Sequence, residues 1–402
     1  MVRISRCWLH VAASSLLSVL VLAPEWGWCR LRAQGQTAPE KPPGYLGMGF
    51  SEDNPPVVGE VTENGPAAKA GIKEGDIVLR VGDTPVKNVR STVEAIRLLK
   101  PGDQVNVTVR RKDKEMEIRL VVGKRPAIKK PSWKPEVTVR AEDYRQVRQQ
   151  FRTKLVRQGP SPQKTPMPNA PSGVTVVEFD SGALRLKGWI NRPEREAPKR
   201  PAIVFLHGGF GFGEDDWKMT QAYRDAGYVV LTPILRGENG QPGMFTLFYD
   251  EVDDALAAAD YLAKQPYVDN SRLFVAGHSV GGILAMLSAE ASPRFHAAAS
   301  FSGSPDQVLY CRYGFPKKEI PFDVADPREF EVRSPLAYAG SFKCPVRLFY
   351  GTDEKHLDET SKRTAAIAKE KGIDCEAIPV EGGHETAVPA AMKKSIAFFE
   401  SK

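Results

Sequence analysis

The amino-acid sequence predicts an α/β protein in which a small, mainly β domain precedes a larger domain with a mostly parallel sheet and helices on both faces. Three observations support this fold class. Residues 44–122 contain short β-prone runs, tight turns and one longer helical pattern. From residue 174 onward, strand-like runs alternate with helix-like segments. The chain of 402 residues is also long enough for two or three domains.

The overall composition is that of a globular protein and selects no class of partner. Hydrophobic residues make up 42% of the chain and charged residues 26%. The formal net charge of +7 is modest for this length, so it indicates a particular partner only where the basic residues cluster.

The first 33 residues are typical of a signal peptide. Arg3 and Arg6 precede an apolar run at 11–23, which is short for a transmembrane helix. An uncleaved membrane anchor is the less favoured alternative. We therefore expect an exported protein, periplasmic or secreted, in which residues 34–43 form a polar linker.

Three cysteines remain beyond the predicted signal peptide: Cys311, Cys344 and Cys375. An odd number does not suit a disulfide scaffold. Cys344 and Cys375 each precede a predicted strand, so one disulfide between them is an alternative to unpaired buried thiols.

The small domain is expected to consist of closely spaced elements. The sequence predicts helices over 66–71 and 91–99 and strands over 76–81, 105–109 and 116–122. Ser91 is the expected N-cap of the second helix, because its hydroxyl can accept a hydrogen bond from the first turn.

The order of these elements resembles a PDZ domain of the bacterial type. The resemblance spans residues 44–122 and rests on segments 45–48 (YLGM), 64–72 (NGPAAKAGI) and 75–78 (GDIV). PDZ domains bind an extended peptide by adding it as a strand to an open sheet edge.

This resemblance implies a binding site for the C-terminus of a peptide or protein. The backbone amides around Leu46, Gly47 and Met48 would hold the terminal carboxylate, and helix 91–99 would form the other wall of the groove. A domain that only packs against its neighbour is the alternative.

Residues 123–172 form a basic connector between the two domains. From residue 124 to residue 164 there are twelve Lys or Arg against three Asp or Glu. Tyr144, Val147, Phe151 and Leu155 follow helical spacing and predict an amphipathic basic helix.

This helix has two expected uses. Its apolar stripe docks on one of the domains while its charges stay solvated, or it makes a weak contact with an acidic membrane surface. The first is favoured. A nucleic-acid partner conflicts with export, so none is expected.

The larger domain is expected over residues 173–402. Strands are predicted at 174–179, 184–191, 202–206, 228–232, 272–276, 297–301, 346–350 and 375–380, and helices at 251–263, 282–287, 359–370 and 386–400. The segment between residues 302 and 344 has weak periodicity. It is interpreted as an insertion over the strand ends that supplies the walls of a substrate pocket.

Residues 277–281 (GHSVG) fit the pattern G-x-S-x-G of a nucleophile elbow. In such an elbow a serine sits on a tight turn between a strand and a helix, and the glycines avoid clashes with the packed backbone. The flanking segments predict that strand and that helix. Ser279 is therefore the expected nucleophile.

A serine needs a base and an orienting acid to act as a nucleophile at neutral pH. In the chain order serine, acid, histidine, the expected base is His384, in a glycine loop after the last strand. The expected acid is Asp353, which follows strand 346–350; Glu354 and Asp358 are the fallbacks. Such groups are expected at the carboxyl ends of parallel strands.

An oxyanion hole is expected at residues 207–210 (HGGF), directly after strand 202–206. Its donors would be the backbone amides of Gly209, with Phe210 as an alternative, and of Val280 after the nucleophile. His207 is interpreted as a structural brace of this loop.

Residues 174–402 resemble the α/β-hydrolase superfamily, and are similar to dienelactone-hydrolase-like and prolyl-oligopeptidase-like enzymes. Beside the elbow and the predicted triad, segments 269–273 (DNSRL), 334–338 (SPLAY) and 351–354 (GTDE) support this. Serine instead of cysteine at the elbow argues against dienelactone hydrolase activity. The upstream residues are too few for the β-propeller of prolyl oligopeptidases.

The resemblance implies an exported serine hydrolase that cleaves small carboxylic esters through a Ser–Asp–His triad and an acyl-enzyme. A prolyl-oligopeptidase-like peptidase and a PDZ-based binding protein with a non-catalytic hydrolase scaffold are the alternatives. No cofactor or metal is expected, because metal-ligand spacings, phosphate loops and dinucleotide fingerprints are lacking.

Overall fold

The computed structural model describes residues 44–52, 55–124, 136–193, 198–313 and 315–402, and the chain forms two compact units that divide between Ala127 and Ile128. The predicted signal peptide and the linker at 34–43 lie outside the described residues. In the part of the chain that is described, no helix combines the length and the apolar character needed to span a membrane.

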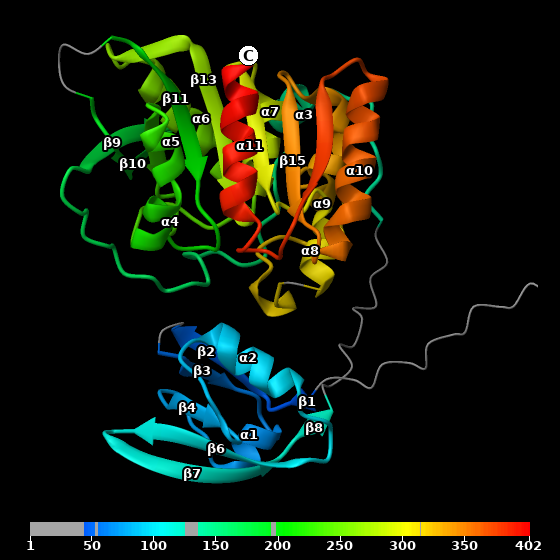
Figure 1. Ribbon diagram of the computed structural model, residues 1–402. Coiled ribbons are helices and arrows are strands. Elements are labelled where there is room, and N and C mark those ends of the chain that lie inside the picture. The colour runs from blue at the N-terminus through cyan, green and yellow to red at the C-terminus, as the bar shows by residue number, and fades with distance from the viewer. Residues whose placement is uncertain (1–43, 53–54, 125–135, 194–197, 314) are drawn as a thin grey trace, which may run out of the picture. The chain divides into compact units, whose positions relative to one another are not determined.

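The first unit is built on an antiparallel sheet (Figure 1). Its strands, in spatial order, are β2 (Met48–Glu52), β3 (Val57–Val61), β4 (Ile77–Val81), β6 (Gln104–Arg111) and β7 (Lys114–Val121). β5 (Thr84–Pro85) pairs with β4, while β1 (Gly44–Tyr45) and β8 (Gly123–Lys124) form a separate two-stranded ribbon. The alternation of buried Val105, Val107 and Val109 along β6 turns one face of the sheet into the core, as the sequence predicts.

Two helices complete this unit, α1 (Pro66–Ala70) and α2 (Val89–Arg97). The prediction that Ser91 caps α2 is wrong. Asn88 is the N-cap: its side chain accepts a hydrogen bond from Ser91 N–H at 2.9 Å, and Ser91 Oγ accepts one from Asn88 N–H at 3.2 Å. Ser91 is thus the third helical residue of a capping box, which begins the helix earlier than the apolar periodicity indicates.

The second unit contains a mixed, mostly parallel sheet of eight strands. In chain order they are β9 (Thr175–Ser181), β10 (Leu184–Ile190), β11 (Arg200–Leu206), β12 (Val229–Pro233), β13 (Val268–His278), β14 (Ala297–Phe301), β15 (Val346–Gly351) and β16 (Cys375–Val380). The spatial order is β16-β15-β14-β13-β11-β12-β10-β9. The β9–β10 hairpin joins antiparallel to β12, and the other neighbours are parallel.

Helices cover both faces of this sheet, as predicted (Figure 1). One hydrophobic cluster includes α6 (Glu251–Ala263), α7 (Val280–Ala291) and α10 (Lys355–Glu370). A second cluster includes α4 (Glu214–Met219), α5 (Gln221–Asp225) and α11 (Val388–Glu400). All twelve residues of α7 are buried, so this helix is fixed at the centre of the domain.

The predicted insertion folds into short helices near the carboxyl ends of the parallel strands (Figure 1). They are α8 (Gln307–Tyr313), a 3₁₀ turn η1 (Lys317–Glu319), α9 (Pro327–Glu331) and a second 3₁₀ segment η2 (Pro335–Ser341). The fully buried Arg333, between α9 and η2, pairs with Glu329 at 2.6 Å and donates to the carbonyl of Thr246 at 3.0 Å. These contacts tie the insertion to the body of the domain.

The connector packs on the second unit through α3 (Tyr144–Gln150). Tyr144 is fully buried and its hydroxyl donates to Val332 O at 2.7 Å. Arg148 departs from the predicted solvated face, because it is largely buried and binds Tyr249 O and Asp253, each at 2.7 Å. The helix is also shorter than its spacing predicts, since Leu155 instead forms a β-bridge with Phe322.

The predicted weak contact of this helix with an acidic membrane surface stays a prediction. The three cysteines Cys311, Cys344 and Cys375 are free, buried thiols, and burial raises the pKa of both Cys344 and Cys375 to about 12. The alternative of a disulfide between the latter two is therefore not the arrangement that the structure has.

Candidate active site

Ser279 occupies a strained turn between β13 and α7. Its backbone has φ +55° and ψ −115°, a conformation that non-glycine residues rarely adopt. Its N–H donates to Phe301 O at 2.7 Å, which anchors the turn on the neighbouring strand β14. An added Cβ at Gly277 would lie 2.3 Å from Gly281 O, and one at Gly281 would lie 1.9 Å from Leu206 O. The two glycines of the motif are thus required by backbone packing.

The histidine predicted as the base lies within hydrogen-bond distance of this serine. Nε2 of His384 is 2.9 Å from Ser279 Oγ, and Nδ1 is 2.7 Å from Glu354 Oε1. The structure therefore brings together two of the three residues predicted for the triad. The third position is taken by Glu354, one of the two fallbacks, and not by Asp353.

The turn after β15 explains this correction. Asp353 is exposed, and its N–H donates to Gly382 O at 3.0 Å, so its backbone supports the histidine loop while its side chain faces outward. Glu354 is buried and follows one position later, where the chain has turned inward. Its longer side chain reaches the imidazole. The other fallback, Asp358, accepts a hydrogen bond from the hydroxyl of Tyr350 at 2.5 Å.

Two further groups hold the carboxylate of Glu354. Its Oε2 accepts hydrogen bonds from Ser302 Oγ at 2.5 Å and from Gly351 N–H at 2.8 Å, which leaves Oε1 for the histidine. Ser302 follows β14 and has φ +52°, so backbone strain accompanies this contact. No motif in the sequence pointed to Ser302.

His384 and Glu354 each stabilise the charged form of the other. Burial alone would lower the pKa of His384, but the hydrogen bond and the negative charge of Glu354 outweigh burial and raise it above its usual 6.5. Burial likewise works to raise the pKa of Glu354, and hydrogen bonds from His384, Ser302 and Gly351 outweigh it and lower the pKa. The carboxylate is therefore ionised at neutral pH and favours protonation of the imidazole.

The predicted oxyanion loop passes beside the nucleophile. An added Cβ at Gly208 would lie 3.7 Å from Ser279 Cβ, and Gly209 has φ +66°. Val280 is the first residue of α7, so its N–H is one of the amides in the first turn that have no partner within the helix. Both predicted donors thus belong to backbone that adjoins Ser279.

His207 is the first residue of this loop, and its side chain is buried. Its Nε2 is 2.9 Å from Glu238 Oε2, and both side chains are buried. Burial works to lower the pKa of His207, but the charge of Glu238 dominates and raises it to about 9. His207 is therefore a buried cation paired with Glu238, a contact that matches a bracing function and leaves its ring outside the triad.

A segment of the connector crosses the oxyanion loop. We call residues 159–166 the strap. Phe210 N–H donates to Gln163 Oε1 at 3.1 Å, and Ser161 Oγ donates to Phe210 O, so strap side chains bind both backbone groups of Phe210. Hydrogen bonds to strap carbonyls fix both ends, from Phe245 N–H to Gly159 O at 2.9 Å and from the Asn239 side-chain amide to Pro166 O at 2.9 Å. No pattern in the sequence indicated this contact.

Aromatic side chains form a wall next to the oxyanion loop. The ring of Phe210 lies 5.1 Å from that of Phe245 and 5.3 Å from that of Phe315, and Tyr310 lies 6.1 Å from Phe315. Phe315 and Tyr310 come from the segment that the sequence assigned to the pocket walls.

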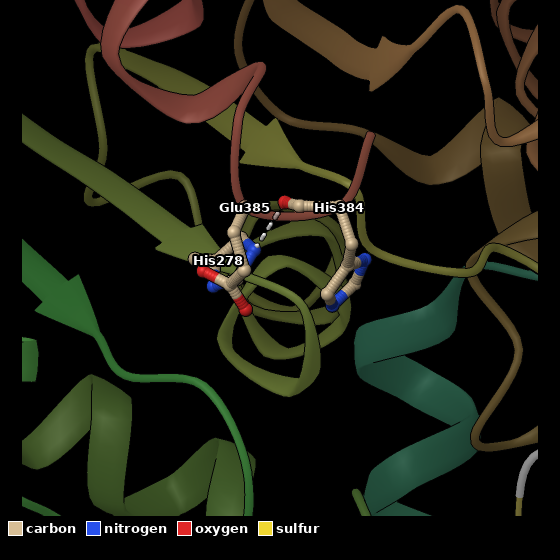
Figure 2. A group of neighbouring side chains, drawn as sticks. All are labelled: His278, His384 and Glu385. Atoms are coloured by element: carbon tan, nitrogen blue, oxygen red, sulfur yellow. Dashed lines mark hydrogen bonds between the residues drawn. The ribbon is translucent and has the colours of Figure 1, made fainter. Parts of the chain in front are cut away.

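One group near the triad has the composition of a metal site. His278, His384 and Glu385 place potential ligand atoms within 4.8 Å of one another, and Figure 2 shows all three side chains. The nitrogens of His384 are engaged with Ser279 and Glu354, and His278 Nε2 lies 3.0 Å from His384 O. A metal ion would have to compete with these hydrogen bonds.

The predicted carboxylate-binding loop of the small unit has its carbonyls bound inside the domain. Ala67 N–H donates to Leu46 O at 2.8 Å, and Thr62 N–H donates to Gly47 O at 2.9 Å. Because a trans peptide points its N–H opposite to its C=O, the amides of Gly47 and Met48 face away from these partners. Gly47 has φ +76°, which permits this turn.

Comparison with known proteins supports both resemblances. Residues 44–122 match the family model of the PDZ domain, and residues 215–400 match that of the prolyl oligopeptidase family. The chain is 26% identical over 207 residues to the uncharacterized peptidase YtmA of Bacillus subtilis (strain 168), which covers 48% of this chain and 77% of that protein.

Two further matches show the limits of these similarities. The chain is 34% identical over 98 residues to the serine endoprotease DegS of Salmonella typhimurium (strain 14028s / SGSC 2262), covering 21% of this chain and 28% of that protein. A puromycin-hydrolyzing peptidase of Mycobacterium tuberculosis has a similar fold, with 20% identity, a TM-score of 0.50, and coverage of 75% of this chain and 45% of that one. The chain thus spans less than half of either protein.

Proposed function

Because this chain joins a PDZ domain to a serine hydrolase domain of the prolyl oligopeptidase family, we propose that it hydrolyses carboxylic esters through an acyl-enzyme on Ser279. The observation that carries the proposal is the unbroken line of hydrogen bonds from Ser279 through His384 to Glu354, at 2.9 and 2.7 Å. A scaffold without catalytic function would require neither these two hydrogen bonds nor the strained backbone of Ser279.

The first half of the reaction uses His384 as the base. Nε2 takes the proton of Ser279 Oγ while the oxygen attacks the carbonyl carbon, and the electron pair of the C=O bond moves to its oxygen. Glu354 holds the Nδ1–H tautomer, which leaves Nε2 free to accept this proton, and it stabilises the imidazolium that forms.

The oxyanion is proposed to lie between the oxyanion loop and the start of α7. The amides of Gly209 and Val280 would donate to it, and the N-terminal end of the twelve-residue α7 adds a favourable dipole. When the intermediate collapses, His384 returns its proton to the leaving alcohol. Water then attacks the acyl-enzyme by the same steps and releases the acid.

Peptide cleavage is the second candidate. It is favoured by the prolyl oligopeptidase family match and by YtmA, which is described as a peptidase. An amine is a poorer leaving group than an alcohol, so this reaction depends more strongly on proton donation from His384.

The test begins with a fluorophosphonate probe and a panel of p-nitrophenyl esters with acyl chains of increasing length. We expect labelling and ester turnover with the natural chain, and neither with Ser279→Ala. Short peptide anilides and unmodified peptides are assayed in parallel. Turnover of esters without peptide cleavage supports the first candidate, efficient peptide cleavage supports the second, and folded protein without labelling contradicts both.

For the small domain we propose that the amides of Leu46, Gly47 and Met48 bind the terminal carboxylate of a peptide or protein. Support comes from the PDZ match and from the orientation of the amides of Gly47 and Met48. Peptides with a free C-terminus should bind in a fluorescence-anisotropy library screen, while the same sequences with an amidated C-terminus should not. Equal binding of both forms would contradict a carboxylate site.

We also propose that the protein is exported to the periplasm or secreted. The proposal rests on the charge and apolar pattern of residues 1–33 and on the similarity of the PDZ part to relatives described as probable periplasmic serine endoproteases of Brucella. Fractionation of the native host and N-terminal sequencing of the mature protein test it. Recovery of the intact N-terminus in the cytosol would contradict it.

A further inference from the structure

The x position of the elbow motif carries a histidine that the triad mechanism does not use. His278 precedes Ser279 at the end of β13, and its side chain is buried, with 3% of its surface exposed. Figure 2 shows its ring turned toward the backbone of the loop that carries His384 and Glu385. Nε2 of His278 lies 3.0 Å from His384 O, and the two imidazole rings lie 4.8 Å apart at an angle of 48°.

The loop that carries His384 needs such an anchor. Its glycines Gly382 and Gly383 allow many backbone conformations, and Gly382 has φ +117°. The side chain of His384 is 45% exposed, so packing alone does not hold it. Neighbouring bonds fix the start of the loop, including Gly383 N–H to Thr386 Oγ1 at 2.8 Å. The contact with His278 acts on the backbone of His384 itself.

The hydrogen bond defines the state of His278. Because a carbonyl oxygen only accepts, Nε2 must carry the proton. Burial lowers the pKa of His278, more strongly than the charges of Glu385 and Glu354 raise it, so the ring is neutral at neutral pH. Its Nδ1 faces the oxyanion loop, where an added Cβ at Gly208 would lie 3.2 Å away. The ring thus fills the space between the oxyanion loop and the histidine loop.

We propose that His278 is a positioning residue that holds the backbone of His384 so that Nε2 stays within reach of Ser279 Oγ. This inference rests on the proposed hydrolase function and adds a fourth side chain to the residues on which that function depends. The elbow therefore supplies both the nucleophile and, one residue earlier, the anchor of its base.

A matched pair of variants tests this in the full chain. In His278→Gln the side-chain amide nitrogen can take the place of Nε2 and donate to His384 O, whereas His278→Met has similar length and no donor. A displacement of about 1 Å in catalytic geometry can cost roughly 100-fold in rate. We expect His278→Met to lower kcat for a p-nitrophenyl ester by about 10- to 100-fold with KM changed less than about threefold. His278→Gln should retain kcat within about threefold of the natural chain.

Two further readouts separate positioning from a general loss of structure. The rate of fluorophosphonate labelling of Ser279 should fall in His278→Met by the same factor as kcat, while its thermal unfolding midpoint stays close to that of His278→Gln. His278→Phe gives a second non-donor variant that fills the same space, in case the methionine variant does not fold. Ser279→Ala in the same assays tests the proposed hydrolase function itself.

The outcomes are distinct. Equal kcat for His278→Met and His278→Gln, with an active natural chain, overturns the positioning inference and leaves the hydrolase function standing. Absence of labelling and turnover in the natural chain overturns the hydrolase function first. Loss of activity on addition of EDTA, restored by Zn²⁺, would instead identify His278 as a metal ligand with His384 and Glu385, and would also overturn the inference.

Discussion

At the scale of single residues, the adjacent carboxylates Asp353 and Glu354 offer a direct comparison. We expect Glu354→Gln to lower kcat by on the order of 10³–10⁴-fold, because an amide no longer stabilises the Nδ1–H tautomer and the imidazolium. Asp353→Asn is the control and should stay within about threefold, since its side chain is exposed and Nδ1 of the imidazole is bonded to Glu354 instead. Steady-state kinetics with one ester measure both. The reverse ranking would show that Asp353 is the acid.

The pH dependence of kcat/KM is a second test of the contact between His384 and Glu354. His384 must be neutral to accept the proton of Ser279, so kcat/KM should fall as the pH drops through the pKa of His384, which Glu354 raises above its usual 6.5. Removing the charge in Glu354→Gln lowers that pKa, and the acid limb should therefore move to lower pH. An acid limb that stays in place would contradict the assignment of Glu354.

The sequence predicted that Ser279 and His384 lie together as candidate nucleophile and base, because each belongs to a local pattern, the elbow at 277–281 and the glycine loop around His384. The choice between Asp353 and Glu354 depends on which residue the turn after β15 directs inward. Glu354 is held there by Gly351 at the end of the same strand and by Ser302, which follows the neighbouring strand β14. Local pattern and spacing carry no information about the contact with Ser302.

At the scale of elements, the elbow depends on the absence of a side chain at Gly281. Gly281→Ala places a Cβ 1.9 Å from Leu206 O on β11, so the turn or the strand must shift. Overpacking of this kind costs about 1–3 kcal/mol of unfolding free energy, and we expect kcat to fall at least 100-fold. Gly213→Ala is the control, because its Cβ would meet nothing closer than 3.6 Å. Urea unfolding and ester kinetics measure the two effects.

The strap gives the second prediction at this scale. Gln163→Leu keeps the size of the side chain but removes the acceptor for Phe210 N–H. A hydrogen bond contributes about 1 kcal/mol, so we expect kcat to fall about 3- to 10-fold and the unfolding free energy to fall by no more than about 1 kcal/mol. Lys164→Ala, at an exposed neighbouring position, should leave kcat unchanged. An increase of kcat in Gln163→Leu would show that the strap blocks the oxyanion loop and does not brace it.

Most strands and helices were predictable because each has its own periodicity, and α6 was expected at the residues that it occupies. The strap has no regular structure. Its place on the oxyanion loop is set by single hydrogen bonds to Phe210 and Asn239. A stretch rich in proline and serine predicts only an irregular connection.

At the scale of the whole molecule, Arg333 joins three parts of the second unit. It is fully buried, pairs with Glu329 at 2.6 Å, and donates to Thr153 of the connector at 2.7 Å and to Thr246 O at 3.0 Å. Arg333→Met leaves Glu329 buried without its cation, and we expect a loss of about 3–5 kcal/mol in unfolding free energy. Lys154→Ala removes an exposed ion pair with Asp323 and should cost less than about 1 kcal/mol. Urea denaturation distinguishes them, and equal losses would contradict a central function of Arg333.

The same contacts join the described part of the connector, from residue 136 onward, to the second compact unit, whereas the change in composition indicated a boundary near residue 173. The sequence predicted that the apolar stripe of the connector helix docks on a domain while its charges stay solvated. The buried side chains of Tyr144, Arg148 and Ser161 anchor the connector on the hydrolase unit. Composition describes the average exposure of a segment, and a few anchoring residues are enough to change where the fold begins.

The exposure of His384 has a consequence for the fate of the acyl group. The side chain of His384 is 45% exposed to solvent. It can therefore accept a proton from small nucleophiles other than water. An alcohol or amine dissolved at high concentration would compete for the ester carbonyl carbon and carry the acyl group away. On the proposed mechanism, an added alcohol or amine should therefore give the transferred acyl product beside the free acid.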